Sequence, residues 1–152
     1  MIQLHVIVTT AFTKLFAADM SARGGGKILN VASTAAFQPG PWMTVYYATK
    51  AYMLSYSEAA NESLKGSDVT VTCLCPGPTP TNFQVRANNR KKGILRHVKT
   101  PAEFVARAGY RRMMAGKPLV VPGIFNRLGV FTIRFLPRNL VTFLSGKAAE
   151  KS

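Results

Sequence analysis

The sequence predicts an α/β fold built on a parallel sheet, and two observations lead to this prediction. Apolar runs at 27–32 (KILNVA) and 69–75 (VTVTCLC), each bounded by turn-forming residues, are typical of buried strands. Apolar residues at helical spacing fill the segment before the first run and the segment between the two runs. This alternation of helix and strand favours right-handed crossovers and parallel pairing.

The first half of the chain is predicted as helix, strand, helix and strand. The opening helix covers 1–22 and ends at glycines 24–26, which tolerate left-handed backbone geometry. Glutamine, proline and glycine at 38–41 form a loop, and an alanine-rich helix follows at 43–64. Proline and glycine from position 76 onward stop the second strand.

Three residues mark the start of a helix in the second half. Thr100 can cap a helix, Pro101 suits a first turn, and Glu103 stands three residues after Thr100, as in a capping box. This helix is expected to run to about residue 115, before a short third strand at 119–121. Three strands are few for such an architecture, so the sheet is predicted to be incomplete.

The charge is unevenly distributed. Twenty Lys and Arg against six Asp and Glu give a net charge of +14. Residues 1–83 hold five basic and four acidic side chains, whereas residues 84–152 hold fifteen basic and two acidic ones. A basic half predicts an anionic partner, which could be phosphate, nucleic acid or a lipid surface. Six of the positive charges lie in the segment 84–99, which we interpret as a mobile loop, with a short helix within it left open.

The end of the chain is predicted as a basic, amphipathic helical tail. We divide the chain into a domain of residues 1–121 and a tail of residues 122–152, with helices at 124–136 and 140–149 separated by Pro137. The tail mixes phenylalanine and leucine with arginine and lysine. That mixture is typical of a helix in a membrane interface, and it equally suits a tail packed against the domain. The sequence leaves both open.

Composition excludes several classes of protein. With 47% hydrophobic residues, the chain is not disordered throughout. Two cysteines are too few to stabilise a fold of 152 residues by disulfide bonds. Cys73 and Cys75 alternate on one strand face and are predicted to be buried apolar residues, with no metal bound. Residues 1–13 lack the basic start of a signal peptide. Prolines interrupt the longest uncharged stretch, 28–49, so we expect no membrane-spanning helix. We expect a cytoplasmic location, with peripheral membrane contact left open.

Three side chains are predicted to form a proton-transfer site. Tyr46 and Lys50 are four residues apart and share one helix face. An adjacent ammonium favours the phenolate and is expected to lower the pKa of Tyr46 from its ordinary value near 10. Ser33 directly follows the first strand, and Pro76 and Gly77 follow the second. Ligands collect at the carboxyl ends of parallel strands, so these signals indicate one site.

One set of spaced residues resembles the second half of a short-chain dehydrogenase/reductase: Ser33 after a strand, Tyr46-x-x-x-Lys50, and Pro76-Gly77-x-x-x-Thr81 after the next strand. The segments ILNVASTAAF, YYATKAY and CPGPTPT are similar to the sequences of that family, and the resemblance is strongest over residues 1–83. It implies a truncated, Rossmann-like, doubly wound parallel sheet with about three strands retained and flanking helices. The tail from Pro122 resembles a bacterial branch of the family.

The resemblance implies a role for each residue. Tyr46 would exchange a proton with the substrate oxygen, Lys50 would lower the pKa of Tyr46 and hold the nicotinamide ribose, and Ser33 would orient the carbonyl. Pro76, Gly77 and Thr79, with the Thr81 hydroxyl, would position the nicotinamide of NAD(P). The implied reaction is hydride transfer between NAD(P) and a small-molecule carbonyl or alcohol, with an acyl or lipid-like substrate left open. The helices at 1–22 and 43–64 would form a homo-oligomer contact.

The sequence departs from the family at two places. His5 stands where the family usually has the asparagine that supports a proton-relay water. The glycine-rich turn that cradles the pyrophosphate is absent, and glycines 24–26 follow a helix and precede a strand, which is the reverse order. Loss of that half would leave the strand at 27–32 with an unpaired edge. We therefore expect a fragment, a start assigned at an internal Met, or a decayed relative, with impaired or no activity as an isolated chain.

Three functions remain open at this point. The first is an oxidoreductase, or the catalytic half of one. The second is a non-enzymatic remnant that self-associates through the retained helices or the open strand edge. The third is a basic module for a membrane surface or nucleic acid, and nucleic acid is disfavoured because no stacking platform or nucleic-acid motif accompanies the charge.

Overall fold

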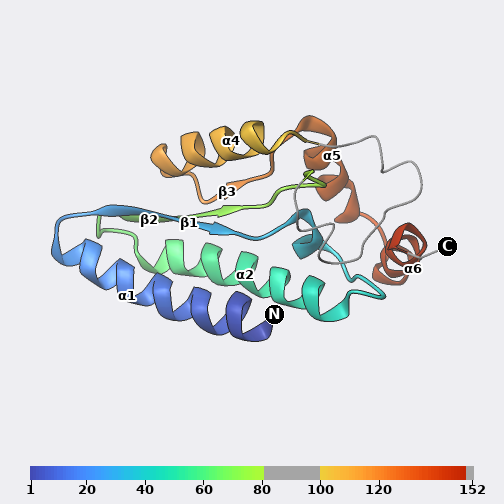
Figure 1. Cartoon of the computed structure of the whole chain (residues 1–152), viewed down its shortest axis with the longest axis horizontal. Helices are drawn as coiled ribbons and strands as arrows, with labels where there is room; N and C mark the ends of the chain where they lie inside the picture. The colour runs from blue at the N-terminus through green and yellow to red at the C-terminus, as the bar shows by residue number, and fades with distance from the viewer. Residues whose placement is uncertain (81–99, 150–152) are drawn as a thin grey trace.

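The computed structural model describes residues 1–80 and 100–149, and over these residues it is an α/β fold with a parallel sheet (Figure 1). Its elements are η1 (Gln3–Val8), α1 (Thr9–Ala22), β1 (Gly26–Val31), η2 (Thr34–Phe37), α2 (Thr44–Ser63), β2 (Val69–Leu74), α4 (Ala102–Met114), β3 (Leu119–Val120), α5 (Ile124–Ile133) and α6 (Arg138–Ala149). The predicted fold class and order of elements are therefore confirmed. The segment predicted as a loop at 84–99 lies outside the described residues.

The sheet has three strands in the order β1-β2-β3, and both pairs are parallel. β1 pairs with β2 along its whole length, from Gly26 opposite Val69 to Val31 opposite Leu74. β2 is the central strand, and Val71, Thr72 and Cys73 within it have no exposed surface. Among the described residues no strand pairs with the other side of β1, so that edge of the sheet is open.

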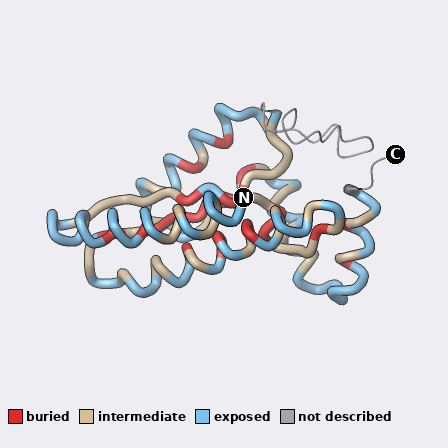
Figure 2. The backbone as a smooth tube through the Cα atoms, turned by 60° about the horizontal axis from the view of Figure 1, so that its bottom comes forward, coloured by how far each residue is buried: buried red, intermediate tan, exposed pale blue. Residues whose placement is uncertain are grey.

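Helices cover both faces of the sheet. α1 and α2 lie on one face and α4 lies on the other (Figure 1). Met53 and Leu54 of α2 pack with Cys73 and Cys75, while Val105 of α4 packs with Leu74 and Val120. Figure 2 shows the buried residues concentrated along the strands and the helix faces turned toward them. Burial of β2 on both faces explains its run of apolar and β-branched residues.

One local prediction is confirmed in more detail and one needs correction. The opening helix is present, and its first turns, Gln3–Val8, are π-helical. The predicted capping box at Thr100 and Glu103 is wrong, because α4 begins at Ala102 with no side-chain cap. Pro101 takes the N-cap position, which puts Thr100 one residue too early to cap. Glu103 instead accepts hydrogen bonds from Arg107, at 2.7 and 3.1 Å.

The last two helices, α5 and α6, lie beyond the carboxyl ends of the strands (Figure 1). Pro137 separates them, as predicted. None of the ten residues of α5, all of them described, is buried, whereas α6 buries Val141 and Ser145. Within residues 1–80 and 100–149, the structure has no helix of the length and apolarity needed to traverse a bilayer.

Candidate active site

Ser33, Tyr46 and Lys50 meet where β1 ends. Ser33 follows the strand in extended conformation at the N-cap of η2, and its Oγ accepts a hydrogen bond of 3.1 Å from the backbone N–H of Ala35. Tyr46 and Lys50 both lie on α2, and the Tyr46 side chain forms a hydrogen bond with Ser33. The Nζ atom of Lys50 lies 5.9 Å from the centroid of the Tyr46 ring. The structure thus brings together the three residues that the spacing predicted.

The Lys50 ammonium is buried and held in place by the backbone. Its Nζ donates a hydrogen bond of 2.9 Å to the carbonyl oxygen of Val31, the last residue of β1, and lies 3.5 Å from the sulfur of Met53. Burial lowers the pKa of Lys50, and the nearby thiols of Cys73 and Cys75 act in the opposite direction. The carbonyl contact fixes the ammonium beneath the Tyr46 ring at the open edge of the sheet.

The expected lowering of the Tyr46 pKa is wrong for this structure. Burial raises the pKa of Tyr46, because the phenolate loses water, and the hydrogen bond with Ser33 only partly opposes this. The Nζ atom of Lys50 donates its hydrogen bond to the Val31 carbonyl, and burial remains the largest influence on the pKa of the phenol. The phenol is therefore held in its protonated form, which is the form that donates a proton to a substrate oxygen.

His5 joins the same cluster from η1. Its ring lies edge-on to the Tyr46 ring, with centroids 6.2 Å apart, and its Nδ1 lies 2.9 Å from Oγ1 of Thr49. The Thr49 hydroxyl donates its single proton to the carbonyl oxygen of Tyr46, at 2.9 Å. The Thr49 oxygen therefore accepts a hydrogen bond from Nδ1–H of His5. Burial, then the positive charges of Lys50 and the amino terminus, lowers the pKa of His5, which favours the neutral ring.

The turn after β2 forms the other wall of the site. The carbonyl oxygen of Pro76 accepts hydrogen bonds from the backbone N–H of Thr34, at 2.9 Å, and from Oγ of Ser33, at 3.5 Å. The carbonyl oxygen of Gly77 accepts a bond of 3.1 Å from Oγ1 of Thr79. These contacts place Pro76 beside the Ser33 loop, with Gly77 and Thr79 bonded to each other in the same turn. Thr81, the fourth residue predicted here, lies outside the described residues.

Asn126 of α5 presses against Gly77. A β-carbon at Gly77 would collide with the Asn126 side chain, so only glycine permits this approach. Nδ2 of Asn126 donates to the carbonyl oxygen of Pro122, at 2.7 Å, and to Oγ1 of Thr100, at 3.3 Å. The asparagine thus packs the start of α5 against the turn after β2 and bonds it to the segment before α4.

Sequence reasoning missed Asn126, Thr49 and Asn30. Asn30 is buried in β1, where its Nδ2 donates to Oγ of Ser57, at 3.0 Å, and to Oγ1 of Thr13, at 3.2 Å, linking the strand to α1 and α2. A polar residue inside the apolar run 27–32 was the available signal for Asn30. Asn126 and Thr49 gave no comparable signal, because their partners are distant in sequence or belong to the backbone.

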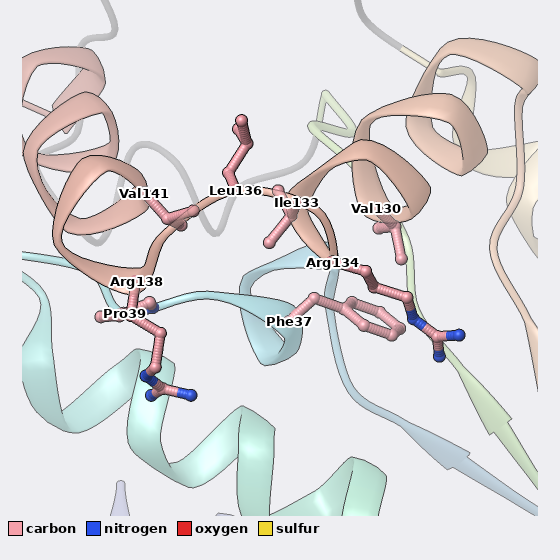
Figure 3. Close-up of a pocket in the computed structure, with 8 residues that line it drawn as sticks. All are labelled: Phe37, Pro39, Val130, Ile133, Arg134, Leu136, Arg138 and Val141. Carbon is pink, nitrogen blue, oxygen red and sulfur yellow. The ribbon is translucent and has the colours of Figure 1, made fainter.

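Two cavities lie near this site, and His5 and Lys50 line the first of them. One, of about 380 Å³, is a groove between the η1–α1 helix and the open edge of β1; Leu4, His5, Val8, Phe12, Phe16, Val31 and Lys50 are among the residues that line it, and we name it the α1–β1 groove. The other, of about 250 Å³, lies between η2 and the last two helices (Figure 3). In it Phe37 faces Val130 and Ile133, while Arg134 and Arg138 stand at its two sides.

The residues present fit one part of an NAD(P) site. Lys50 and Tyr46 border the open edge of β1, where a nicotinamide ribose could be held, and the turn at Gly77 offers backbone beside them. The pyrophosphate part is not matched. Glycines 24–26 lie between α1 and β1, at the opposite end of the strand from Ser33, so their amides cannot serve this site.

Comparison with known proteins identifies a family. A family model described as short chain dehydrogenase matches residues 1–92. The uncharacterized oxidoreductase YvrD of Bacillus subtilis is 38% identical over 79 residues, which cover 52% of this chain and 30% of the relative. The ketoacyl reductase HetN of a Nostoc species is 32% identical over 107 residues, which cover 68% and 37%. The chain therefore spans about a third of the length of these curated relatives.

Solved structures have the same fold. A 7beta-hydroxysteroid dehydrogenase superimposes with a TM-score of 0.83 at 20% identity, covering 95% of this chain and 57% of that one. A short-chain dehydrogenase from Sphingobium yanoikuyae, solved in complex with NADPH, has a TM-score of 0.73 at 22% identity and covers 99% and 57%. At these identities the likeness establishes the fold, and the match covers little more than half of each neighbour.

Proposed function

This chain belongs to the short-chain dehydrogenase family, and on that premise we propose that it carries the catalytic half of an NAD(P)-dependent oxidoreductase. The reaction is the interconversion of a carbonyl and an alcohol by hydride transfer. The observation that carries the proposal is the convergence of Ser33, Tyr46 and Lys50 at the end of β1. Family membership supports oxidoreduction in general, and this geometry supports the assignment of roles.

Each of the three side chains has a distinct part in the proton transfer. Tyr46 is held protonated and donates its proton to the oxygen that becomes the alcohol. Ser33, already bonded to Tyr46, holds that oxygen in line. Lys50 supplies a fixed positive charge that stabilises the phenolate left on Tyr46. NAD(P), when bound, supplies or accepts the hydride.

We propose an apolar, acyl or lipid-like molecule as the substrate. The support comes from the relatives, one of which is named a ketoacyl reductase and another a hydroxysteroid dehydrogenase. The aromatic and aliphatic side chains of the cavity beside η2 agree with such a substrate.

As an isolated chain the protein is proposed to be impaired, because no described glycine turn faces the site to bind the pyrophosphate. The experiment is a titration with NADPH and NADH, followed by cofactor fluorescence at low and moderate salt. We expect no saturable binding that survives moderate salt. Saturable, salt-tolerant binding would overturn the proposed impairment and show that the half-site works alone.

Turnover at high cofactor concentration tests the roles. With a panel of apolar ketones, any activity should disappear in Tyr46→Phe and persist in Tyr47→Phe, which changes a neighbouring half-buried tyrosine. Activity that persists in Tyr46→Phe contradicts the proposed site.

Self-association is the second candidate function, and a specific feature favours it. The open edge of β1 offers unpaired backbone groups beside the apolar α1–β1 groove. A second copy could cover this surface, through the strand edge or through the faces of α1 and α2. This alternative predicts oligomers in solution and no affinity for cofactor.

A further inference from the structure

The outer face of α5 is apolar and uncovered. Ile124, Leu128, Phe131 and Phe135 recur at helical spacing, and all four are exposed. Phe125 and Phe135 are 74% and 71% exposed, which is unusual for phenylalanine. The Phe131 and Phe135 rings pack edge-to-face with centroids 5.1 Å apart. These side chains thus form a continuous apolar ridge along the helix.

The opposite face of the same segment is attached to the domain. Val130 and Ile133 turn toward Phe37 of η2 (Figure 3), and Asn126 anchors the first turn. α6 is attached through buried Val141 and exposes Leu140, Phe143 and Leu144. The segment of residues 124–149, which we name the α5–α6 tail, is thus fixed by one side and open on the other. Figure 2 shows it mostly exposed.

Cations border this apolar surface, and none of the ion pairs among residues 1–80 and 100–149 involves them. Arg127, Arg134, Arg138 and Lys147 are exposed, and the sequence contains no Asp or Glu from 104 to 149. Nζ of Lys147 lies 4.9 Å from the centroid of the exposed Phe143 ring, so a cation and an aromatic ring are presented together. Long cationic side chains of this kind keep their charge at headgroup level while their stems cover apolar surface.

We propose that the α5–α6 tail docks on an anionic lipid surface, with the phenylalanine ridge entering the acyl boundary and the cations contacting lipid phosphates. Charge complementarity selects this occupant, because a second copy would bring the same unopposed positive charge to the contact. A membrane supplies both the apolar phase and the negative charge that this surface lacks. The inference does not depend on oxidoreductase activity.

Vesicle co-sedimentation of the full chain tests the proposal. We expect binding to vesicles of equal parts phosphatidylcholine and phosphatidylglycerol, and little binding to phosphatidylcholine alone. Phe125→Ser with Phe135→Ser should weaken binding at least about tenfold. The matched control, Phe104→Ser with Tyr110→Ser, removes two exposed aromatic side chains of α4 and should bind like the unmodified chain.

Charge variants separate docking from general attraction. Arg127→Gln with Lys147→Gln should weaken binding by about tenfold or more, since each cation near the surface contributes about fivefold. Arg111→Gln with Arg112→Gln on α4 should have a smaller effect. Equal loss from both charge pairs, or unchanged binding in the phenylalanine variant, would overturn the proposal in favour of charge alone. Circular dichroism checks that each variant is folded. The comparison of the two vesicle compositions uses the unmodified chain alone, so it tests the proposal even if a variant fails to fold.

A second copy of the chain is the competing partner for the apolar surface of the α5–α6 tail. Sedimentation velocity without vesicles should show the same oligomeric state for the unmodified chain and for the phenylalanine variant. An oligomer that dissociates in that variant, combined with no vesicle binding, would assign the surface to a second copy and overturn the proposal. Binding to duplex DNA as strong as to vesicles, with the same loss in the charge variants only, would also overturn it.

Discussion

The α1–β1 groove and the α5–α6 tail are both apolar surfaces open to solvent, yet they differ in charge and in backbone. The groove borders an unpaired strand edge, and its single cation, Lys50, is buried and bonded to Val31. The tail has no strand edge and presents four exposed cations. Exposed apolar area alone therefore does not define a partner. Backbone edge plus apolar area suits a protein strand, whereas cations plus apolar area suit a lipid surface.

The largest expected effect separates the two surfaces by self-association. Phe12→Ser with Phe16→Ser removes two exposed aromatic side chains from the wall of the α1–β1 groove. If a second copy covers the groove, each ring contributes about 1.5–3 kcal/mol, so we expect the dissociation constant of the oligomer to rise about a hundredfold or more. Sedimentation velocity over a concentration series measures it.

The tail variant Phe125→Ser with Phe135→Ser is the matched control for that measurement. It should leave the oligomer unchanged while losing vesicle binding, and the groove variant should do the reverse. An oligomer that dissociates in the tail variant instead would invert the comparison.

The next effect contrasts the buried and the open strand. Val71 in β2 has 0% exposure, whereas Val31 at the end of β1 is 48% exposed. Val71→Ala should lower the free energy of unfolding by about 2 kcal/mol, because it leaves a cavity in a two-sided core. Val31→Ala should cost less than about 0.5 kcal/mol. Urea denaturation gives both values, and a large loss in Val31→Ala would mean that this edge is covered in solution.

The sequence could predict the strands, the helices and the meeting of Ser33, Tyr46 and Lys50, because each rests on a local period or on a fixed place at a strand end. It could not predict that burial would raise the pKa of Tyr46, since burial depends on every element around the ring. The capping box was wrong because α4 begins one residue later than the spacing implied, with Pro101 at the N-cap. The Thr100 hydroxyl instead accepts a hydrogen bond from Asn126 of α5.

A smaller effect concerns the packing of α5 on the site. Gly77→Ala adds a β-carbon where the Asn126 side chain lies, so that side chain or α5 itself must shift. We expect a loss of about 1–3 kcal/mol of stability from this overpacking. Gly129→Ala, on the same helix with open space around it, should be neutral or slightly stabilising. Thermal unfolding compares the two, and equal behaviour would show that α5 does not rest on the turn after β2.

The smallest effect is a pH dependence confined to the α1–β1 groove. His5 lines the groove, and burial and Lys50 lower its pKa from 6.5. The folded state thus favours the neutral ring, so its contribution to stability is present above pH 6.5 and is lost as pH falls from there through the lower folded value. The α5–α6 tail contains only Arg and Lys as charged groups between 124 and 149, and vesicle binding should stay constant over the same interval of pH.

Urea denaturation at several pH values measures how stability depends on pH. His5→Asn should flatten this pH profile. His97→Asn, which changes the other histidine of the sequence, should leave the part of the slope that His5 produces. A profile that keeps its slope in His5→Asn would mean that the groove does not restrain the His5 ring in solution, and the pH difference between the two surfaces would disappear with it.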